Sequence, residues 1–170
     1  MNSDVVNDAL AALANVNIRH AGSGDSLSII RLISEVWAEY GCVLDAEVEE
    51  TCLLTPDTYF RARGGKFWVA EDEWQIIATV AFMMLDPAVA ELRSLYVKRE
   101  YRGLGLGQRL TTMAVDLARA RQAREIVLWS DTRFTLAHRL YDRMGFERNG
   151  LRRLDDLNNS TEFRFRYRLG

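Results

Sequence analysis

The sequence predicts a single α/β (α+β) domain in which a mixed, mostly antiparallel sheet is flanked by helices. Apolar residues recur at helical spacing early in the chain and alternate at strand spacing from Lys66 onwards, and after Val97 helices and strands take turns. A length of 170 residues with 48% hydrophobic and 27% charged residues fits one globular domain. We therefore assign residues 16–170 to the domain and residues 1–15 to an N-terminal arm.

The first half of the chain is expected to place helices before an antiparallel hairpin. Asp25 stands at the N-cap position of a helix that Gly41 ends, and Pro56 ends or restarts the acidic segment that follows. Strand-type alternation then predicts the hairpin, which turns at residues 71–73. The expected elements in order are a short amphipathic helix over Asp4–Ala14, a strand over Val16–Arg19, the helix over residues 25–41, an acidic helix over about Asp45–Leu54, and strands over Phe67–Ala70 and Gln75–Leu85.

The second half is expected to alternate strands with helices. Asp86-Pro87 breaks the chain before a strand over Ala90–Val97, and a glycine-rich turn over Gly103–Gly107 opens a helix with an apolar face. The remaining elements are a buried strand over Ile126–Trp129, a helix over Thr135–Met144 that Gly145 closes, and a last strand over Thr161–Leu169. Aromatic residues alternate with arginines in that strand, which favours a half-buried strand over a nucleic-acid-binding face.

Composition excludes several classes of protein. The formal net charge of −2 gives no general attraction to nucleic acid or to an anionic membrane surface, so neither is an expected partner. Two cysteines, Cys42 and Cys52, exclude a disulfide scaffold and are most simply small apolar residues. No apolar run of about 18 residues is present and Met1–Ile18 lacks a basic n-region, so we expect a soluble, cytoplasmic protein. The two histidines, His20 and His138, indicate no metal site, and His138 is expected at the surface.

A strand, a glycine-rich loop and a helix follow one another over residues 91–110. Successive glycines let backbone N–H groups point into one concavity, and the helix N-terminus adds partial positive charge, an arrangement that suits a pyrophosphate. Arg102 and Arg109 flank the loop with permanent positive charge. A dinucleotide fingerprint would need glycine where Gln108 stands. A P-loop would instead need Gly-Lys-Ser/Thr where the chain has Gly107-Gln108-Arg109. A glycine turn that binds nothing is the remaining alternative.

Two blocks of the sequence resemble signatures of the GNAT superfamily of N-acetyltransferases. Arg102-Gly-Leu-Gly-Leu-Gly107 is similar to its acyl-CoA pyrophosphate loop. Ala137-His-Arg-Leu-Tyr-Asp-Arg-Met-Gly-Phe146 is similar to the Ala-x-x-Leu-Tyr-x-x-x-Gly-Phe block near its C-terminus. The blocks stand in the family's order, and the order of the elements fits over nearly the whole chain. The resemblance implies a single GNAT-type domain that uses acetyl-CoA as acyl donor.

The resemblance also implies which residues carry the chemistry, in which an amine attacks the thioester directly within a ternary complex. Tyr141 matches the tyrosine that protonates the departing sulfur, with a core aromatic as the alternative. Glu91 lies 14 residues before Gly105, where histone-type members place a catalytic glutamate; the alternative is a strand carboxylate paired with Arg93 or solvent. A backbone N–H of the strand over residues 95–97 would bind the oxyanion.

The cofactor site implied by the resemblance combines that strand with the glycine loop and with residues near the second block. Phe134 departs from the family pattern, which often has Asn there, so a polar contact is lost or moved to Asp131 or Thr132. The implied cofactor-binding residues are Leu95, Tyr96, Val97, Arg102, Gly103, Leu104, Gly105, Leu106, Gly107, Gln108, Thr132 and Phe134.

The acceptor is expected to be a small-molecule amine, most simply a cationic one. Residues 1–90 carry a charge balance of −9 and residues 91–170 one of +7, which reflects either scattered solvated charges or two ligands of opposite charge. Family members usually wall the acceptor site with their first helices, where this chain has Glu35, Glu39, Asp45, Glu47, Glu49, Glu50 and Asp57. The alternatives are a lysine or N-terminal acetyltransferase of proteins and peptides, and a module that binds acyl-CoA without turnover. Dimers through the C-terminal strand are common in the family, and the residues neither indicate nor exclude a homodimer.

Overall fold

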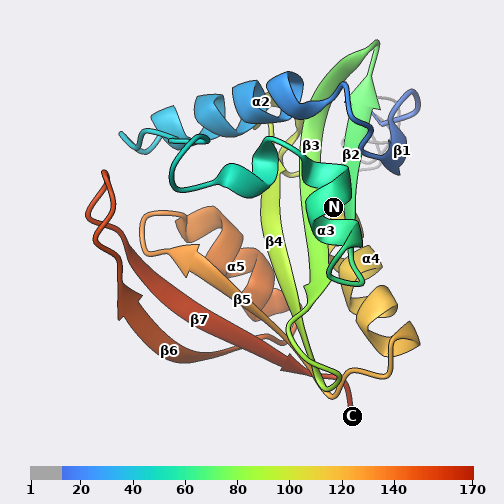
Figure 1. The fold of residues 1–170 in the computed structure, drawn as a ribbon, viewed down its shortest axis with the longest axis vertical. Helices are drawn as coiled ribbons and strands as arrows, with labels where there is room; N and C mark the ends of the chain where they lie inside the picture. The colour runs from blue at the N-terminus through green and yellow to red at the C-terminus, as the bar shows by residue number, and fades with distance from the viewer. Residues whose placement is uncertain (1–12) are drawn as a thin grey trace, which may run out of the picture.

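The computed structural model describes residues 13–170, so the predicted helix over Asp4–Ala14 lies largely outside the described residues. A seven-stranded sheet in the order β1-β2-β3-β4-β5-β7-β6 forms its centre (Figure 1). The strands are β1 Asn17–His20, β2 Lys66–Asp72, β3 Gln75–Met84, β4 Val89–Val97, β5 Glu125–Asp131, β6 Glu147–Arg153 and β7 Thr161–Arg168. The helices are α2 Ser26–Ala38, α3 Pro56–Arg61, α4 Leu106–Ala120 and α5 Thr135–Arg143, with single 3₁₀ turns η1 Thr51–Leu53 and η2 Arg99–Tyr101.

The sheet is mixed, with one parallel pair. Strands β1 to β4 pair antiparallel, β4 and β5 pair parallel, and β7 pairs antiparallel with both β5 and β6. Helix α4 makes the crossover between the parallel strands, as parallel pairing requires. This topology confirms the predicted mostly antiparallel α/β sheet. None of the helices within residues 13–170 combines the length and the apolar character needed to cross a bilayer.

Helices cover both faces of the sheet and bury one core on each. Ile33 of α2 joins Phe67 of β2 in the core beneath α2 and α3. Leu110 of α4 joins Trp68 of β2 in the core beneath α4 and α5. Phe67 and Trp68 are neighbours in β2 that face opposite cores, because successive side chains of a strand point to opposite faces.

The parallel strands β4 and β5 separate soon after they begin to pair. Their residue pairs are confined to Val89 with Glu125, Ala90 with Ile126 and Glu91 with Val127. Beyond these three pairs β4 continues to Val97 and β5 to Asp131 without pairing with each other, and the two ribbons diverge in Figure 1. The facing edges of both strands therefore keep main-chain donors and acceptors that no strand covers.

A β-bulge in β4 lies inside this opening. Tyr96 pairs with Thr79 and Arg93 with Ala81, so two β4 residues oppose one β3 residue. Ser94, at the bulge, has a φ of 51°, and its carbonyl accepts a 2.7 Å hydrogen bond from the Thr79 hydroxyl. The extra residue shifts the alternation of side chains by one, and Tyr96 consequently packs with the core beneath α2.

One predicted element of the fold is wrong, and one observed strand was not predicted. The acidic helix over Asp45–Leu54 does not form, because the Asp45 carboxylate accepts hydrogen bonds from the N–H groups of Glu47 and Val48 and closes a turn instead. Only η1 is helical there, and Pro56 starts α3. Strand β6 was not expected, because an exposed edge strand with Leu151 as its one large apolar side chain lacks the alternation that marks a half-buried strand.

Candidate active site

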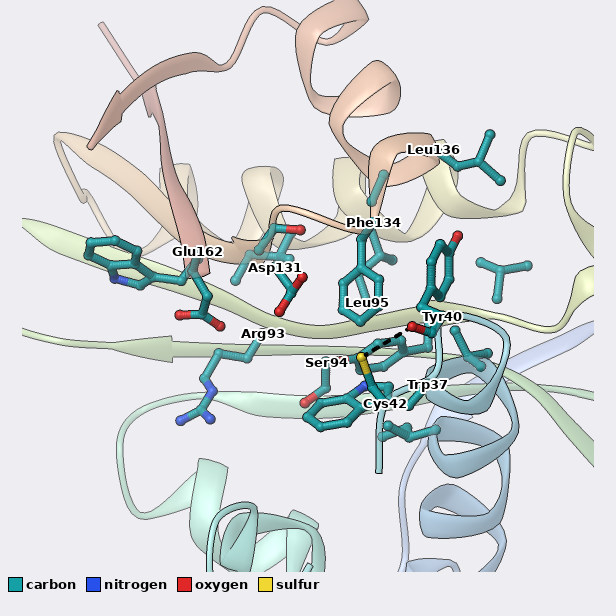
Figure 2. Close-up of a pocket in the computed structure, with 18 of the residues that line it drawn as sticks. Trp37, Tyr40, Cys42, Arg93, Ser94, Leu95, Asp131, Phe134, Leu136 and Glu162 are labelled. Atoms are coloured by element: carbon teal, nitrogen blue, oxygen red, sulfur yellow. Dashed lines mark hydrogen bonds between the residues drawn. The ribbon is translucent and has the colours of Figure 1, made fainter. Parts of the chain in front are cut away.

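A cavity of about 890 Å³ lies where β4 and β5 separate, and residues of both strands form its floor. Its walls come from α2, the segment that follows α2, the glycine loop, α5 and β7. Both predicted catalytic residues, Tyr141 and Glu91, line it (Figure 2 shows part of this wall). Residues from the two sequence blocks thus meet in one concavity.

The glycine loop forms one end of the cavity and presents unpaired main-chain donors. Gly103 and Gly105 have φ angles of 77° and 86°, and a Cβ atom on either would meet no atom within 4 Å. Gly105 precedes the first turn of α4. Within residues 13–170, the N–H groups of residues 103–108 find no protein acceptor in hydrogen-bonding range. Such a cluster of N–H groups at a helix N-terminus suits an anionic ligand such as a diphosphate.

Gly107 has a different reason to be glycine. A Cβ atom there would lie 3.3 Å from Cδ2 of Leu140 on α5, tighter than ordinary packing allows without adjustment. The missing side chain therefore lets the start of α4 approach α5. This contact places the face of α5 that carries Leu140 beside the glycine loop.

Arg102 does not offer its charge freely to a ligand. Its two Nη atoms donate to the Glu39 carboxylate at 2.7 and 2.8 Å, and its Nε donates to the Val97 carbonyl at 2.8 Å. Arg139 and Arg143 of α5, on either side of the Leu140 that packs against Gly107, also line the cavity, are exposed, and form no salt bridge with an acidic side chain among the described residues. Sequence reasoning missed both, although their spacing of four residues on one helix was a readable signal.

The other predicted cofactor residues are placed as follows. Leu95, Tyr96, Val97, Gln108 and Phe134 line the cavity, whereas Leu104, Leu106 and Thr132 do not. Leu106 is buried in the core beneath α4, so only its main chain faces the ligand end. The Thr132 N–H donates a 2.8 Å hydrogen bond to the Thr161 carbonyl.

Asp131 lines the cavity with its carboxylate already in use. Arg133 grips that carboxylate through Nε and Nη2 at 2.8 and 2.7 Å. Burial alone would raise the pKa of Asp131, but the hydrogen bonds from Arg133 outweigh it and hold the pKa below its usual value. Asp131 is therefore not free to replace the polar contact that Phe134 lacks, and Thr132 lies outside the cavity lining.

Tyr141 is a core aromatic and a cavity residue at once. Its ring packs against Phe146 and Phe165 at centroid distances of 5.7 and 5.3 Å, and 4% of its surface is exposed. Burial raises the pKa of the phenol, so the hydroxyl keeps its proton at neutral pH. A protonated phenol in a cavity can donate that proton to an anionic leaving group.

Glu91 sits at the last residue pair before β4 and β5 separate. It forms no salt bridge or side-chain hydrogen bond with any of residues 13–170, since Arg93 pairs with Glu50 instead, at 3.2 Å. Burial raises the pKa of Glu91 against the opposing influence of Arg93 and Arg152. A carboxylate with a raised pKa and no partner is suited to accept a proton.

The end of the cavity away from the glycine loop is charged with both signs. Besides the Arg93–Glu50 pair it holds an ion pair at 2.6 Å between Arg152 of β6 and Glu162 of β7. The Arg152 guanidinium also lies 4.1 Å from the ring centre of Trp129 on β5. Their sequence separations hid these partners from sequence reasoning.

Two loops meet over this charged end. Val43, just after α2, exchanges two hydrogen bonds of 2.8 Å with the Asn158 side chain in the β6–β7 loop. Glu49 accepts a 2.9 Å hydrogen bond from the Leu157 N–H in the same loop. We call this contact the loop bridge. It ties the α2 side of the cavity to the β7 side.

His138 is not at the surface, which corrects the expectation. It is 5% exposed, and its ring nitrogen lies 3.1 Å from the Ser130 hydroxyl. The side chain lies on the face of α5 that packs against Phe163 and Phe165 of β7. Burial and the nearby Arg148 lower its pKa, so it is neutral in the folded protein at neutral pH.

Comparison with known proteins agrees with this geometry. The model of the acetyltransferase (GNAT) family matches residues 29–146. Human N-acetyltransferase 8 is 30% identical over 124 residues, which cover 70% of this chain and 53% of that protein, so the chain spans about half the length of this relative.

Solved structures share the fold. A GNAT-family acetyltransferase from Staphylococcus aureus Mu50 superposes with a TM-score of 0.78 at 21% identity, over 91% of this chain and 99% of that one. A putative acetyltransferase from Salmonella typhimurium, determined with its cofactor acetyl-CoA, has a TM-score of 0.68 at 17% identity, over 92% of this chain and 95% of that one. Because the family model covers well over half of the chain, from α2 to the end of α5, the chain belongs to the GNAT acetyltransferase family.

Proposed function

We propose that the protein transfers an acetyl group from acetyl-CoA to the primary amine of a small molecule. One observation carries the proposal: a single cavity holds the unpaired N–H groups of the glycine loop, the uncovered edge of β4, the protonated Tyr141 and the unpartnered Glu91. The N–H groups and the β4 edge fit a long ligand that combines a diphosphate with amide groups. Tyr141 and Glu91 fit the two proton transfers that amide formation needs.

The residues present fit acetyl-CoA. The N–H groups of residues 103–108 would bind its diphosphate, with Arg139 and Arg143 as the free positive charges beside them. The edge of β4 over residues 95–97 would bind its pantetheine amides as an added strand would. When bound, acetyl-CoA supplies an electrophilic thioester carbonyl and a thiolate leaving group.

The chain's own groups then handle protons and charge. Glu91 accepts a proton from the ammonium form of the acceptor, directly or through water, because an unperturbed alkylammonium has a pKa near ~10.4 and is not nucleophilic. A β4 N–H beside the bulge at Ser94 donates a hydrogen bond to the developing oxyanion. Tyr141 donates its hydroxyl proton to the sulfur that leaves.

The loop bridge favours a small acceptor over a folded protein. Its Glu49 lines the cavity next to Glu50 of the charged end, so the bridge limits the room for an acceptor that would have to lie across an open groove. A lysine or N-terminal acetyltransferase of proteins would need room for the chain on both sides of the amine. The bridge therefore supports the small-molecule reading.

The charges beneath the bridge favour a cationic acceptor. Glu50, Glu91 and Glu162 face only Arg93 and Arg152 there, and the cavity lining adds Glu49, Asp155 and Asp156, so an ammonium group meets an excess of negative charge. Of the seven acids expected to wall this site, Glu49 and Glu50 line the cavity, while Glu39 and Asp57 pair with Arg102 and Arg61. The acidic wall is thus smaller than the sequence predicts, and β4 and β7 complete it.

A product assay tests the proposal. Acetyl-CoA and a panel of amines, each with an uncharged and an anionic analogue, are incubated with the protein, and acetylated amine is detected by mass spectrometry. We expect turnover of cationic primary amines, an approximately hundredfold lower kcat in Tyr141→Phe, and wild-type rates in Tyr59→Phe, a tyrosine outside the cavity. Binding of CoA without any acetylated product from the panel would favour a binding module over an enzyme.

A further inference from the structure

Four aromatic side chains from three parts of the chain meet in the middle of the cavity. Phe134, in the loop before α5, packs edge-on against Tyr40 at a centroid distance of 4.9 Å. It also faces Tyr96 of β4 at 6.3 Å and Trp37 of α2 at 6.4 Å. We call these four residues the aromatic constriction. All of them line the cavity.

The constriction separates the two ends of the cavity. In Figure 2 the Phe134 side chain points from its loop toward Trp37 and Tyr40, with Arg93 and Glu162 drawn on one side and Leu136 on the other. Leu136 lies one helical turn before Leu140, whose side chain packs against Gly107 at the glycine loop. The side with Glu162 is the charged end beneath the loop bridge. A group passed from one end to the other must therefore pass Phe134.

The apolar rings of the constriction suit one part of the acyl donor and amine acceptor, namely the apolar acyl chain of the donor. Its rings offer apolar faces, and the Phe134 ring packs with three other aromatic rings. An ammonium acceptor is matched by the carboxylates beyond it, and a diphosphate by the N–H groups before it. The acyl chain of the donor is the apolar part that remains to be matched.

The rings also limit the space available to that chain. Phe134 is held on the α2 side by Trp37 and Tyr40 and on the sheet side by Tyr96, so it cannot turn aside without losing edge-to-face packing. Tyr96 in turn is held in this orientation by the β4 bulge. Cores and packed clusters of this kind resist added methylene groups.

We propose that the aromatic constriction, with Phe134 as its central member, sets the length of the acyl group and restricts the donor to short acyl chains such as acetyl. The inference rests on the proposed function, since it assumes that the cavity binds an acyl-CoA. It adds a specificity-determining residue to that function. Phe134 is a filter for the donor and takes no proton.

Binding measurements test the inference without any acceptor or turnover. Isothermal titration calorimetry gives the Kd of CoA, acetyl-CoA, butyryl-CoA and hexanoyl-CoA for the wild type and for Phe134→Ala and Phe134→Leu. We expect the wild type to bind hexanoyl-CoA at least about tenfold more weakly than acetyl-CoA, because each methylene that does not fit an apolar site costs binding. Phe134→Ala should bring the two within about threefold, and Phe134→Leu should admit butyryl-CoA but not hexanoyl-CoA.

Trp74→Ala is the matched control, since it truncates an aromatic that is 94% exposed at the far β2–β3 turn. It should leave the ratio of the Kd values at the wild-type value. Thermal unfolding of each variant shows that it is folded, and Phe134→Leu keeps most of the apolar volume should Phe134→Ala unfold. Equal Kd values for acetyl- and hexanoyl-CoA in the wild type, or an unchanged ratio in both Phe134 variants, overturn the inference alone. Absence of binding of CoA and of every thioester contradicts the proposed function itself.

Discussion

Glu39 and Arg102 form a two-point ion pair that joins the end of α2 to the glycine loop. Each guanidinium Nη donates to one carboxylate oxygen, at 2.7 and 2.8 Å, and both side chains are about three quarters buried. A negative charge thus stands beside the loop that is shaped for an anion. The pair fixes the loop's position, and it also opposes the charge of the ligand that the loop would bind.

Glu39→Gln separates these two effects. We expect a free energy of unfolding lower by about 0.5–1 kcal/mol, because a partly exposed ion pair is lost. We expect CoA to bind a few times more tightly, since Arg102 is then free to face the diphosphate. Thermal unfolding and calorimetric titration with CoA measure the two quantities. Weaker CoA binding at unchanged stability would show instead that Glu39 holds Arg102 in its binding position.

Arg139 and Arg143 should carry most of the free positive charge at the cofactor end. Changing both to Gln is expected to raise the Kd for CoA about tenfold at low salt and to flatten the dependence of that Kd on salt concentration. The double variant Arg31→Gln and Arg124→Gln removes the same charge from positions outside the cavity. If both double variants weaken binding equally, net charge rather than these two side chains attracts the cofactor.

The raised pKa of Glu91 predicts both an activity profile and a stability profile. The acid limb of kcat/KM should lie above the usual range of a glutamate, because the carboxyl must lose its proton before it can act as a base. Glu91→Gln should remove that limb and lower kcat by roughly a hundredfold. Glu73→Gln, at an exposed turn, is the control.

The stability of Glu91→Gln follows from the same shift. A carboxyl whose pKa is raised on folding favours the folded state below its unfolded pKa, and that contribution is lost as pH rises through the folded pKa. The wild type and Glu91→Gln should therefore have similar unfolding midpoints in acid, and the variant should become the more stable of the two towards neutral pH. Midpoints measured across this range check the sign, and the opposite order at neutral pH would contradict it.

Opening the loop bridge should widen the choice of acceptors. Asn158→Ala removes both hydrogen bonds to Val43 and is expected to lower the free energy of unfolding by about 1 kcal/mol. The KM for a small amine should rise, and bulkier amines should be acetylated faster relative to small ones. Asn17→Ala, on the exposed edge strand β1, is the control. An unchanged preference for small amines would mean that the bridge does not screen the acceptor.

Local patterns predicted those parts of the site that lie within one stretch of chain. The glycine loop was readable because a strand, a turn and a helix that are consecutive in sequence form it. Tyr141 and Glu91 were implied by the resemblance of sequence blocks to the family, and both line the cavity. The prediction that His138 lies at the surface was wrong, because a histidine on an amphipathic helix gives no sign of a buried hydrogen-bond partner, which here is Ser130. The helix expected over Asp45–Leu54 failed because the side chain of Asp45 competed for backbone N–H groups.

The rest of the site depends on contacts between distant segments. Val43 and Asn158 are 115 residues apart, and Arg102 reaches Glu39 across 63 residues. Phe134 reads in the sequence as a lost polar contact, yet in the fold it becomes the centre of an aromatic cluster. No periodicity in the chain encodes these pairs, since the sheet order decides which segments become neighbours.

The early parting of β4 from β5 has a mechanical consequence for the whole molecule. Three residue pairs are the entire seam between a four-stranded half and a three-stranded half of the sheet. A ligand that hydrogen-bonds to the open edges of β4 and β5 would connect the two halves of the sheet beyond these three pairs. Occupancy should therefore slow amide hydrogen exchange on both sides of the seam and raise the melting temperature of the entire domain.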